Sequence, residues 1–103
     1  MKFLIRMKTR PTSVPIPPEQ TVAMLQASKE LMNAWLEGGL VDCAYGFPAG
    51  DGFCIANHDS HETLMDSILE YPQYPFMDWE ITPLVDANYS FDKFIEYFKN
   101  QPG

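Results

Sequence analysis

The amino-acid sequence predicts one α+β domain: a four-stranded antiparallel sheet, two helices on one face of it, and a further helix at the C-terminus. The chain has 103 residues, enough for a single domain. Apolar residues alternate in four short segments, as in strands, and recur every three or four residues in longer ones, as in helices. The first six segments read strand, helix, strand, strand, helix, strand. That order is typical of an antiparallel sheet with both helices on one side.

The composition narrows the class of protein and its partners. Hydrophobic residues make up 46% and aromatic residues 14% of the chain, which indicates a globular protein. The net charge of -7 argues against nucleic acid and anionic membranes as partners. No apolar run is long enough to span a bilayer, and the apolar stretch near the N-terminus is broken at Arg6, too early for a signal peptide. We therefore expect a cytoplasmic protein.

The first strand covers about residues 2–7, and the first helix covers about residues 18–37. A proline-rich loop over residues 9–18 joins them, and Pro18 suits the first turn of the helix. Gly38 and Gly39 end the helix. In the strand, one face carries Phe3, Ile5 and Met7, and the other carries Lys2, Leu4, Arg6 and Lys8.

A hairpin follows, with strands over residues 40–47 and 53–57 and a turn rich in glycine between them. Alternation places Val41, Cys43, Tyr45 and Phe47 together on one face of its first strand. Pairing Phe47 with Phe53 sets Cys43 opposite Asn57 and Cys54 opposite Gly46. The two cysteines then point to opposite faces and cannot form a disulfide, so we expect both to be reduced.

The second helix and the fourth strand complete the sheet. Asp59 is the expected N-cap of the helix, with Glu62 completing a capping box, and the helix ends before Pro72. The fourth strand then runs to about Thr82 and Pro83. Its Met77, Trp79 and Ile81 face the helices, whereas Phe76, Asp78 and Glu80 lie on the other face.

Residues 85–103 form an extension to the domain of residues 1–84. Ser90 is the expected N-cap of a helix whose apolar face consists of Phe91, Phe94, Ile95 and Phe98. A helix this short is marginal by itself. The sheet face opposite the first two helices also lacks a cover, although it is half apolar. We expect a homodimer or larger homo-oligomer to cover this sheet face, and we expect the last helix to pack across a subunit boundary.

The sequence around the fourth strand resembles the muconolactone delta-isomerase family. The shared pattern is a Leu-rich helix followed by P-x-x-P-aromatic-M-D-x-E, here Pro72, Pro75, Phe76, Met77, Asp78 and Glu80. The likeness covers about residues 1–84. It implies a ferredoxin-like fold that dimerises into an α/β barrel, with a cavity on the open sheet face. It also implies a cofactor-free isomerase that moves a proton on a lactone.

With this resemblance, the candidate catalytic residues are Asp78 or Glu80 as the general base and Arg6 as the anchor of an anionic ligand. The candidate ligand-binding residues are Leu4, Phe76, Tyr74 and His58. The alternative interpretation has equal support: Asp78 and Glu80 are solvated carboxylates that pair with Arg6 or Lys8 across the sheet.

His58 and His61 suggest a metal site only weakly, because helix capping already accounts for the acidic residues beside them. We expect no metal or cofactor. The alternative function is a non-catalytic oligomeric module that binds a small molecule or another protein.

Overall fold

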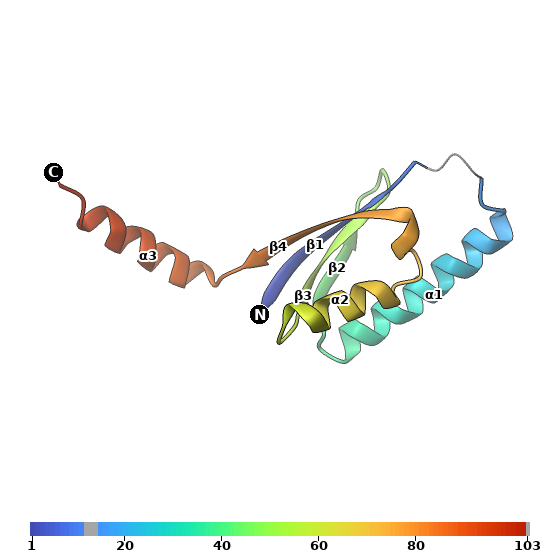
Figure 1. Ribbon diagram of the computed structural model, residues 1–103, viewed down its shortest axis with the longest axis horizontal. Coiled ribbons are helices and arrows are strands. Elements are labelled where there is room, and N and C mark those ends of the chain that lie inside the picture. Colours follow the sequence, from blue (N-terminus) through green and yellow to red (C-terminus); the bar gives the residue numbers. More distant parts are fainter. Residues whose placement is uncertain (12–14, 103) are drawn as a thin grey trace.

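A computed structural model describes residues 1–11 and 15–102, and within them a four-stranded antiparallel sheet in the order β2-β3-β1-β4. The elements are β1 (Lys2–Thr9), α1 (Pro18–Glu37), β2 (Val41–Gly46), β3 (Gly52–Asn57), α2 (His61–Glu70), the 3₁₀ turn η1 (Tyr74–Phe76), β4 (Met77–Leu84) and α3 (Ala87–Lys99). Helices α1 and α2 lie on the same side of the sheet (Figure 1). The predicted α+β architecture is confirmed. Part of the predicted proline-rich loop, residues 12–14, lies outside the described residues.

The hydrophobic core lies between the sheet and these two helices. Central strand β1 contributes Phe3, Ile5 and Met7, and β4 contributes Met77 with Trp79 packed against the cluster. Leu64 and Ile68 supply the buried side of α2. The alternation predicted for the first and fourth strands is therefore confirmed. Phe76 is an exception, because it belongs to the η1 turn that precedes the fourth strand.

The hairpin pairs in a different register from the predicted one. Tyr45, and not Phe47, pairs with Phe53, a shift of two residues along the chain. A shift by an even number keeps every side chain on its face. Cys43 and Cys54 therefore still point to opposite faces, and both are free thiols.

A bulge near the start of β2 overturns the predicted face of one residue. The pairing slips between Val41 and Cys43, so that Val41 pairs with Ala56 and is buried in the core, while Cys43 pairs with Ile55. An extra residue in one strand reverses the alternation at that point. The expectation that Val41 shares a face with Cys43 and Tyr45 is therefore wrong.

Both predicted helix caps are also wrong. The Thr63 backbone N–H donates to Ser60 Oγ over 3.2 Å, so Ser60 caps α2 in place of Asp59. The Tyr89 backbone N–H donates to Asp86 Oδ2 over 3.2 Å, so Asp86 caps α3 in place of Ser90. In both places the sequence offers several residues that can act as caps, and only the path of the chain selects one.

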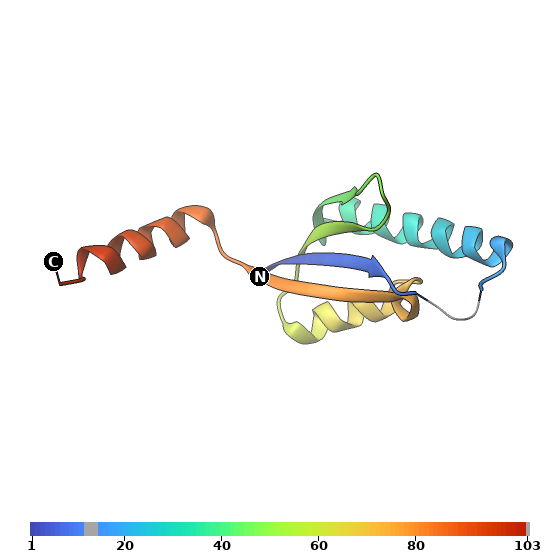
Figure 2. The same cartoon turned by 90° about the horizontal axis from the view of Figure 1, so that it is seen from above.

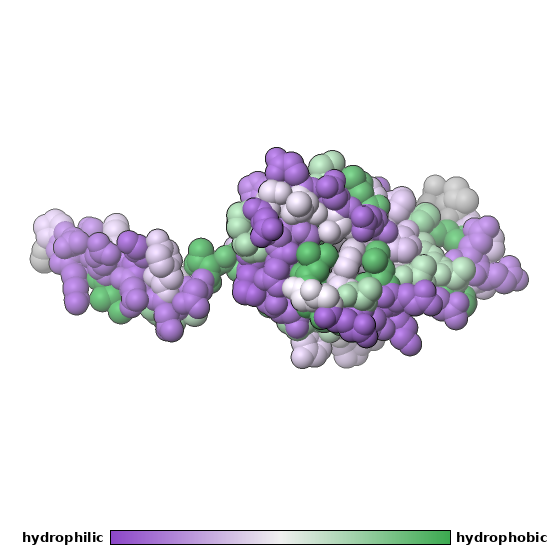
Figure 3. All heavy atoms as spheres, turned by 90° about the horizontal axis from the view of Figure 1, so that it is seen from below, coloured by the Kyte–Doolittle hydropathy of each residue, from purple (hydrophilic) through white to green (hydrophobic). Residues whose placement is uncertain are grey.

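Helix α3 extends away from the domain. It continues in the direction of β4, and the molecule measures 64 Å along its longest axis and 31 Å along the next (Figure 2). None of its residues is buried. The helix forms a lobe of its own, with apolar atoms along one side and a narrow apolar link to the domain (Figure 3). No helix in the described part of the chain is long and apolar enough to cross a membrane.

Candidate functional site

We call the sheet face turned away from α1 and α2 the open sheet face. In the β1–β3 pair, Leu4 lies opposite Ile55 and Arg6 opposite Phe53. In the β1–β4 pair, Arg6 lies opposite Glu80 and Lys8 opposite Asp78. Directly opposed residues of an antiparallel pair are neighbours, with Cβ atoms about 5 Å apart. The structure therefore places Leu4, Arg6, Asp78 and Glu80 on one face of the sheet, as predicted from the sequence, with Arg6 directly opposite Glu80.

The charged residues of this face are mostly paired across strands. Lys8 Nζ lies 3.2 Å from Glu80 Oε1, and Arg10 Nε lies 3.1 Å from Asp78 Oδ1. The carboxylate side chains are well exposed, 54% for Glu80 and 66% for Asp78. Ion pairs with such exposure contribute at most about 1 kcal/mol each to the free energy of unfolding. The plain cross-strand pairing considered from the sequence is therefore present in this structure.

Arg6 differs from the other cations of this face. It makes no ion pair with any residue that the structure describes. Its guanidinium carbon lies 5.6 Å from the centre of the Phe47 ring, a cation–π distance. An arginine held over an aromatic ring, with its hydrogen-bond donors unused by a carboxylate, is suited to binding an anion.

An apolar patch that the sequence analysis missed lies beside Arg6. The ring of Phe53 lies 5.9 Å from the rings of both Tyr45 and Phe47, measured between ring centres. Tyr45 is 65% exposed, and Leu4 and Ile55 continue the patch toward the other end of the sheet. The alternation of the hairpin strands places Tyr45 and Phe47 on one face, but the residues that they contact on the neighbouring strands depend on the register of the hairpin. Together, Arg6 and the patch fit a small ligand with an anionic group and an apolar body.

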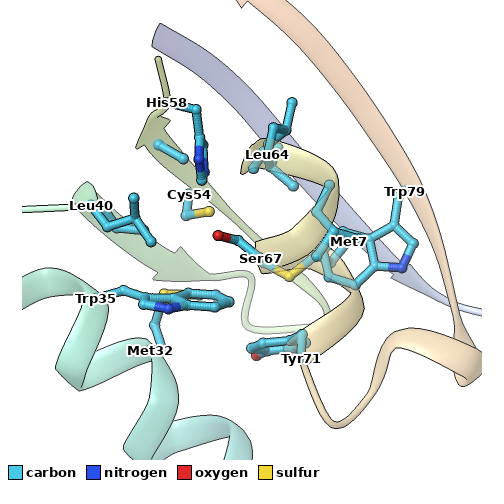
Figure 4. Close-up of a pocket in the computed structure, with 14 residues that line it drawn as sticks. Met7, Met32, Trp35, Leu40, Cys54, His58, Leu64, Ser67, Tyr71 and Trp79 are labelled. Atoms are coloured by element: carbon cyan, nitrogen blue, oxygen red, sulfur yellow. The ribbon is translucent and has the colours of Figure 1, made fainter. Parts of the chain in front are cut away.

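A second candidate site is a cavity between the sheet and the two helices. It measures about 20 Å³, room for about one water molecule. The His58 ring and the Ser67 hydroxyl point into it, among apolar and aromatic side chains (Figure 4). Sequence analysis missed Ser67, because nothing in a helical pattern separates a serine facing a cavity from one facing solvent.

The ionisable groups of this cavity favour their neutral forms. His58 is only 5% exposed, and burial, with a smaller effect of the N-terminal ammonium group, lowers its pKa, while Asp59 acts in the opposite direction. Burial raises the pKa of the Tyr71 hydroxyl and raises that of the Cys54 thiol to about 11. Cys54 is therefore a protonated core residue and not a nucleophile.

The sheet separates the predicted ligand-binding residues into two groups. Tyr74 packs against Trp79 on the helix side, with ring centres 6.1 Å apart, and its carbonyl accepts from Trp79 Nε1 over 3.4 Å. His58 lies at the inner cavity, and Phe76 lies in η1 at the edge of the domain. One subunit therefore cannot place Tyr74 and His58 in the same site as Arg6. Among residues 1–11 and 15–102, no group of three or more potential metal ligands lies together.

Comparison with solved structures identifies the fold. A crystal structure of muconolactone isomerase superimposes with a TM-score of 0.76 at 22% sequence identity, over 84% of this chain and 90% of that chain. The chain has the muconolactone isomerase-like fold. The 5-chloro-2-hydroxyhydroquinone dehydrochlorinase of Burkholderia phenoliruptrix AC1100, in complex with 2,5-dihydroxybenzoquinone, matches with a TM-score of 0.57 at 16% identity, over 86% of this chain and 98% of that chain. No protein-family model matches the sequence, and no curated protein matches it significantly.

The resemblance seen in the sequence is thus supported at the level of structure. The match covers 84% of this chain, and the four strands with α1 and α2 build the open sheet face and the inner cavity. At these levels of identity the likeness establishes the fold. The chemistry must be argued from the residues of this chain.

Proposed function

We propose that this protein is a cofactor-free isomerase that shifts a proton on a small anionic lactone or related unsaturated organic acid, and that the open sheet face carries its site. One observation carries the proposal. Arg6, without an ion-pair partner among the described residues, lies beside an apolar patch and directly opposite Glu80 in the β1–β4 register. An anion anchor, an apolar surface and a carboxylate base are the groups that such a reaction requires.

In this proposal, Arg6 binds the carboxylate of the ligand through two parallel N–H···O bonds. The ring of the ligand lies on the apolar patch. This placement directs the acidic C–H of the ligand toward β4, where the carboxylates lie. The cation also stabilises the negative charge that develops as a proton leaves a carbon next to an unsaturated carbonyl group.

Glu80 is the preferred base, and Asp78 the alternative. Glu80 lies opposite Arg6, whereas Asp78 lies opposite Lys8 and is also held by Arg10. The base takes a proton from one carbon of the ligand and returns a proton to another, so the C=C bond moves and nothing is oxidised or reduced. Cover from a second subunit would exclude bulk water from the ligand and from both carboxylates, which strengthens the electrostatic contacts between them.

Self-association is part of the proposal. Tyr45 and Phe47 are exposed in the single chain, and an apolar face of this kind normally contacts a partner. Two sheets that face one another would enclose the ligand between them, in a homodimer or a larger homo-oligomer in the cytoplasm. The two structurally similar proteins support a role with small molecules, because both are named as enzymes that act on small organic compounds.

A binding experiment separates the anchor from the rest of the face. Muconolactone is titrated against the wild type, Arg6→Met and the control Lys2→Met, with isothermal calorimetry as the readout. Lys2 lies on the same strand face but pairs with Asp42 and Asn57 at the far end. We expect Arg6→Met to weaken binding at least about tenfold, the effect of losing a charged hydrogen-bond partner, and Lys2→Met to leave it unchanged. Equal affinity for all three proteins would refute the anchor.

A non-catalytic binding module is the second candidate. The observation in its favour is that both carboxylates are engaged by cations, Glu80 by Lys8 and Asp78 by Arg10. A module of this kind would bind the same anionic ligands through Arg6 and release them unchanged. Binding without any exchange of ligand protons with solvent would support it over the isomerase.

A further inference from the structure

Three aromatic side chains of the hairpin lie in a row beside Arg6. We call Tyr45, Phe53 and Phe47 the aromatic row. Phe53 lies in the middle, and its ring centre is 5.9 Å from the ring centres of both Tyr45 and Phe47. The planes of neighbouring rings are inclined by 33° and 37°, closer to parallel than to perpendicular. Arg6 lies at one end, with its guanidinium carbon 5.6 Å from the centre of the Phe47 ring. The row therefore joins an aromatic surface to a cation.

The aromatic row is accessible to a ligand in the single chain. Tyr45 is 65% exposed and Phe47 is 40% exposed, while Phe53 is half-buried between them. Phe53 also lies opposite Arg6 in the β1–β3 register, so the middle of the row and the cation belong to one stretch of the sheet. Aromatic rings attract one another through offset-stacked or edge-to-face contacts that saturated groups cannot make. A planar ligand ring therefore gains more from this surface than a saturated ring of the same size.

The hairpin turn holds the end of the row in place. The Phe47 backbone N–H donates to the Asp51 carbonyl over 3.0 Å, and the Phe47 carbonyl accepts from the Gly50 N–H over 2.9 Å. The Asp51 carboxylate in turn accepts from the backbone N–H and the hydroxyl of Thr9, over 2.8 Å and 2.7 Å. These bonds tie the turn to β1, the strand that carries Arg6. A surface that is already ordered loses less conformational entropy when a ligand binds.

The proposed proton shift passes through a species that fits such a surface. When the base takes a proton from the tetrahedral carbon next to the unsaturated carbonyl group, the electron pair of the broken C–H bond joins the π system. The negative charge then lies on the carbonyl oxygen, and the ring of the ligand becomes a planar conjugated anion until a proton returns to the other carbon. A surface that binds this planar anion better than the ground-state ligand accelerates the reaction.

We propose that the aromatic row makes the site selective for planar conjugated carboxylates, with Phe53 and Tyr45 as specificity-determining residues. The inference rests on the proposed function, which places the carboxylate of the ligand at Arg6 and supplies the planar anion. Aryl carboxylates share the planar ring and the carboxylate but have no proton to shift, so they bind as inhibitors. A saturated carboxylate of the same charge binds through Arg6 alone and gains little from the rings.

Two carboxylates of equal charge and similar size test this selectivity. Benzoate has a planar aromatic ring, and cyclohexanecarboxylate has a puckered saturated ring. Each is titrated against the wild type, Phe53→Leu, Tyr45→Leu and the control Tyr74→Leu, and amide NMR spectra give the dissociation constant and the residues that shift. Tyr74 is an aromatic residue on the helix side of the sheet, against Trp79. We expect the wild type and the control to bind benzoate at least about threefold more tightly than cyclohexanecarboxylate, with shifts in β1 and β3.

The two variants of the row should lose at least about half of this preference and keep their affinity for cyclohexanecarboxylate. Tyr45→Leu changes an exposed position, so the test stands even where Phe53→Leu fails to fold. Equal affinity of the wild type for the two carboxylates, binding of neither, or an unchanged preference in Tyr45→Leu would overturn the inference.

These titrations need no turnover, so the inference and the isomerase can fail separately. A preference for benzoate that depends on the row, in a protein that isomerises no lactone, would support the selectivity and contradict the proposed function. Isomerisation of a lactone without any preference for benzoate would contradict the selectivity alone.

Discussion

Replacing Trp79 by alanine should destabilise the protein far more than replacing its neighbour Glu80 by glutamine. Trp79 packs against the core cluster, contacts the rings of Tyr71 and Tyr74 at 5.7 Å and 6.1 Å between centres, and donates from Nε1 to the Tyr74 carbonyl. Truncation of a buried tryptophan costs about 3–5 kcal/mol. Because Trp79 is only partly buried, we expect a loss at the lower end of that range.

Glu80→Gln should lower the free energy of unfolding much less than Trp79→Ala. Glu80 is 54% exposed and forms one ion pair, with Lys8. Glutamine keeps its shape, so the loss is at most about 1 kcal/mol. With a urea m-value of about 1.5 kcal/mol/M, typical of small proteins, Trp79→Ala should lower the unfolding midpoint by about 2 M and Glu80→Gln by less than about 0.7 M.

Urea unfolding followed by circular dichroism measures both variants. All proteins must be compared at one concentration, because oligomerisation makes the midpoint depend on concentration. Trp79→Phe is an informative control, since it keeps an aromatic ring against Tyr71 and should lose less than half as much as alanine. A larger effect of Glu80→Gln than of Trp79→Ala would mean that the faces of β4 are reversed, which is the result of a one-residue slip in register.

Three further predictions follow from burial and packing. Burial lowers the pKa of His58, so the unfolded chain binds a proton at this residue more readily than the folded chain. The free energy of unfolding should therefore fall as the pH drops below about 6.5. His58→Gln should reduce this pH dependence in urea titrations, and an unchanged dependence of the free energy of unfolding on pH would contradict the burial of a neutral ring. Burial raises the pKa of Cys54 to about 11, so iodoacetamide at mildly alkaline pH should label Cys54 only after unfolding, and rapid labelling in the native protein would contradict its place in the core. A chain ending at Asp86 should still unfold cooperatively in urea, since no residue of α3 is buried in the single chain; an unfolded product would show that residues 1–84 do not form a domain by themselves.

The sequence specified the sheet well where alternation was clear. Apolar and charged residues alternate over residues 5–8 of β1 and over residues 77–81 of β4, so the faces of Arg6, Asp78 and Glu80 followed directly from the pattern. The juxtaposition of Arg6 with the carboxylates of β4 was therefore predictable. The ion pairs that hold those carboxylates depend on side-chain conformations, and only the structure distinguishes them from free carboxylates.

The hairpin could not be predicted as well, because a bulge leaves no mark in an apolar pattern. Val41 is apolar and would suit either face, so nothing in the sequence reveals that the alternation reverses before Cys43. The register in turn determines that Tyr45 lies beside Phe53 and that Phe47 lies under Arg6. The apolar half of the candidate site therefore required the structure, whereas its charged half did not.

The most direct test of the proposed isomerase is proton NMR of small unsaturated lactone acids, muconolactone among them, with the protein in D₂O. The account predicts that the wild type moves the C=C bond of at least one of these compounds and introduces deuterium at the carbon that receives the proton. Glu80→Gln should slow this reaction at least about 100-fold, the usual contribution of a general base, and Lys2→Met should not. Failure of the wild type to exceed buffer alone with every compound, or full activity of Glu80→Gln and Asp78→Asn, would contradict the account.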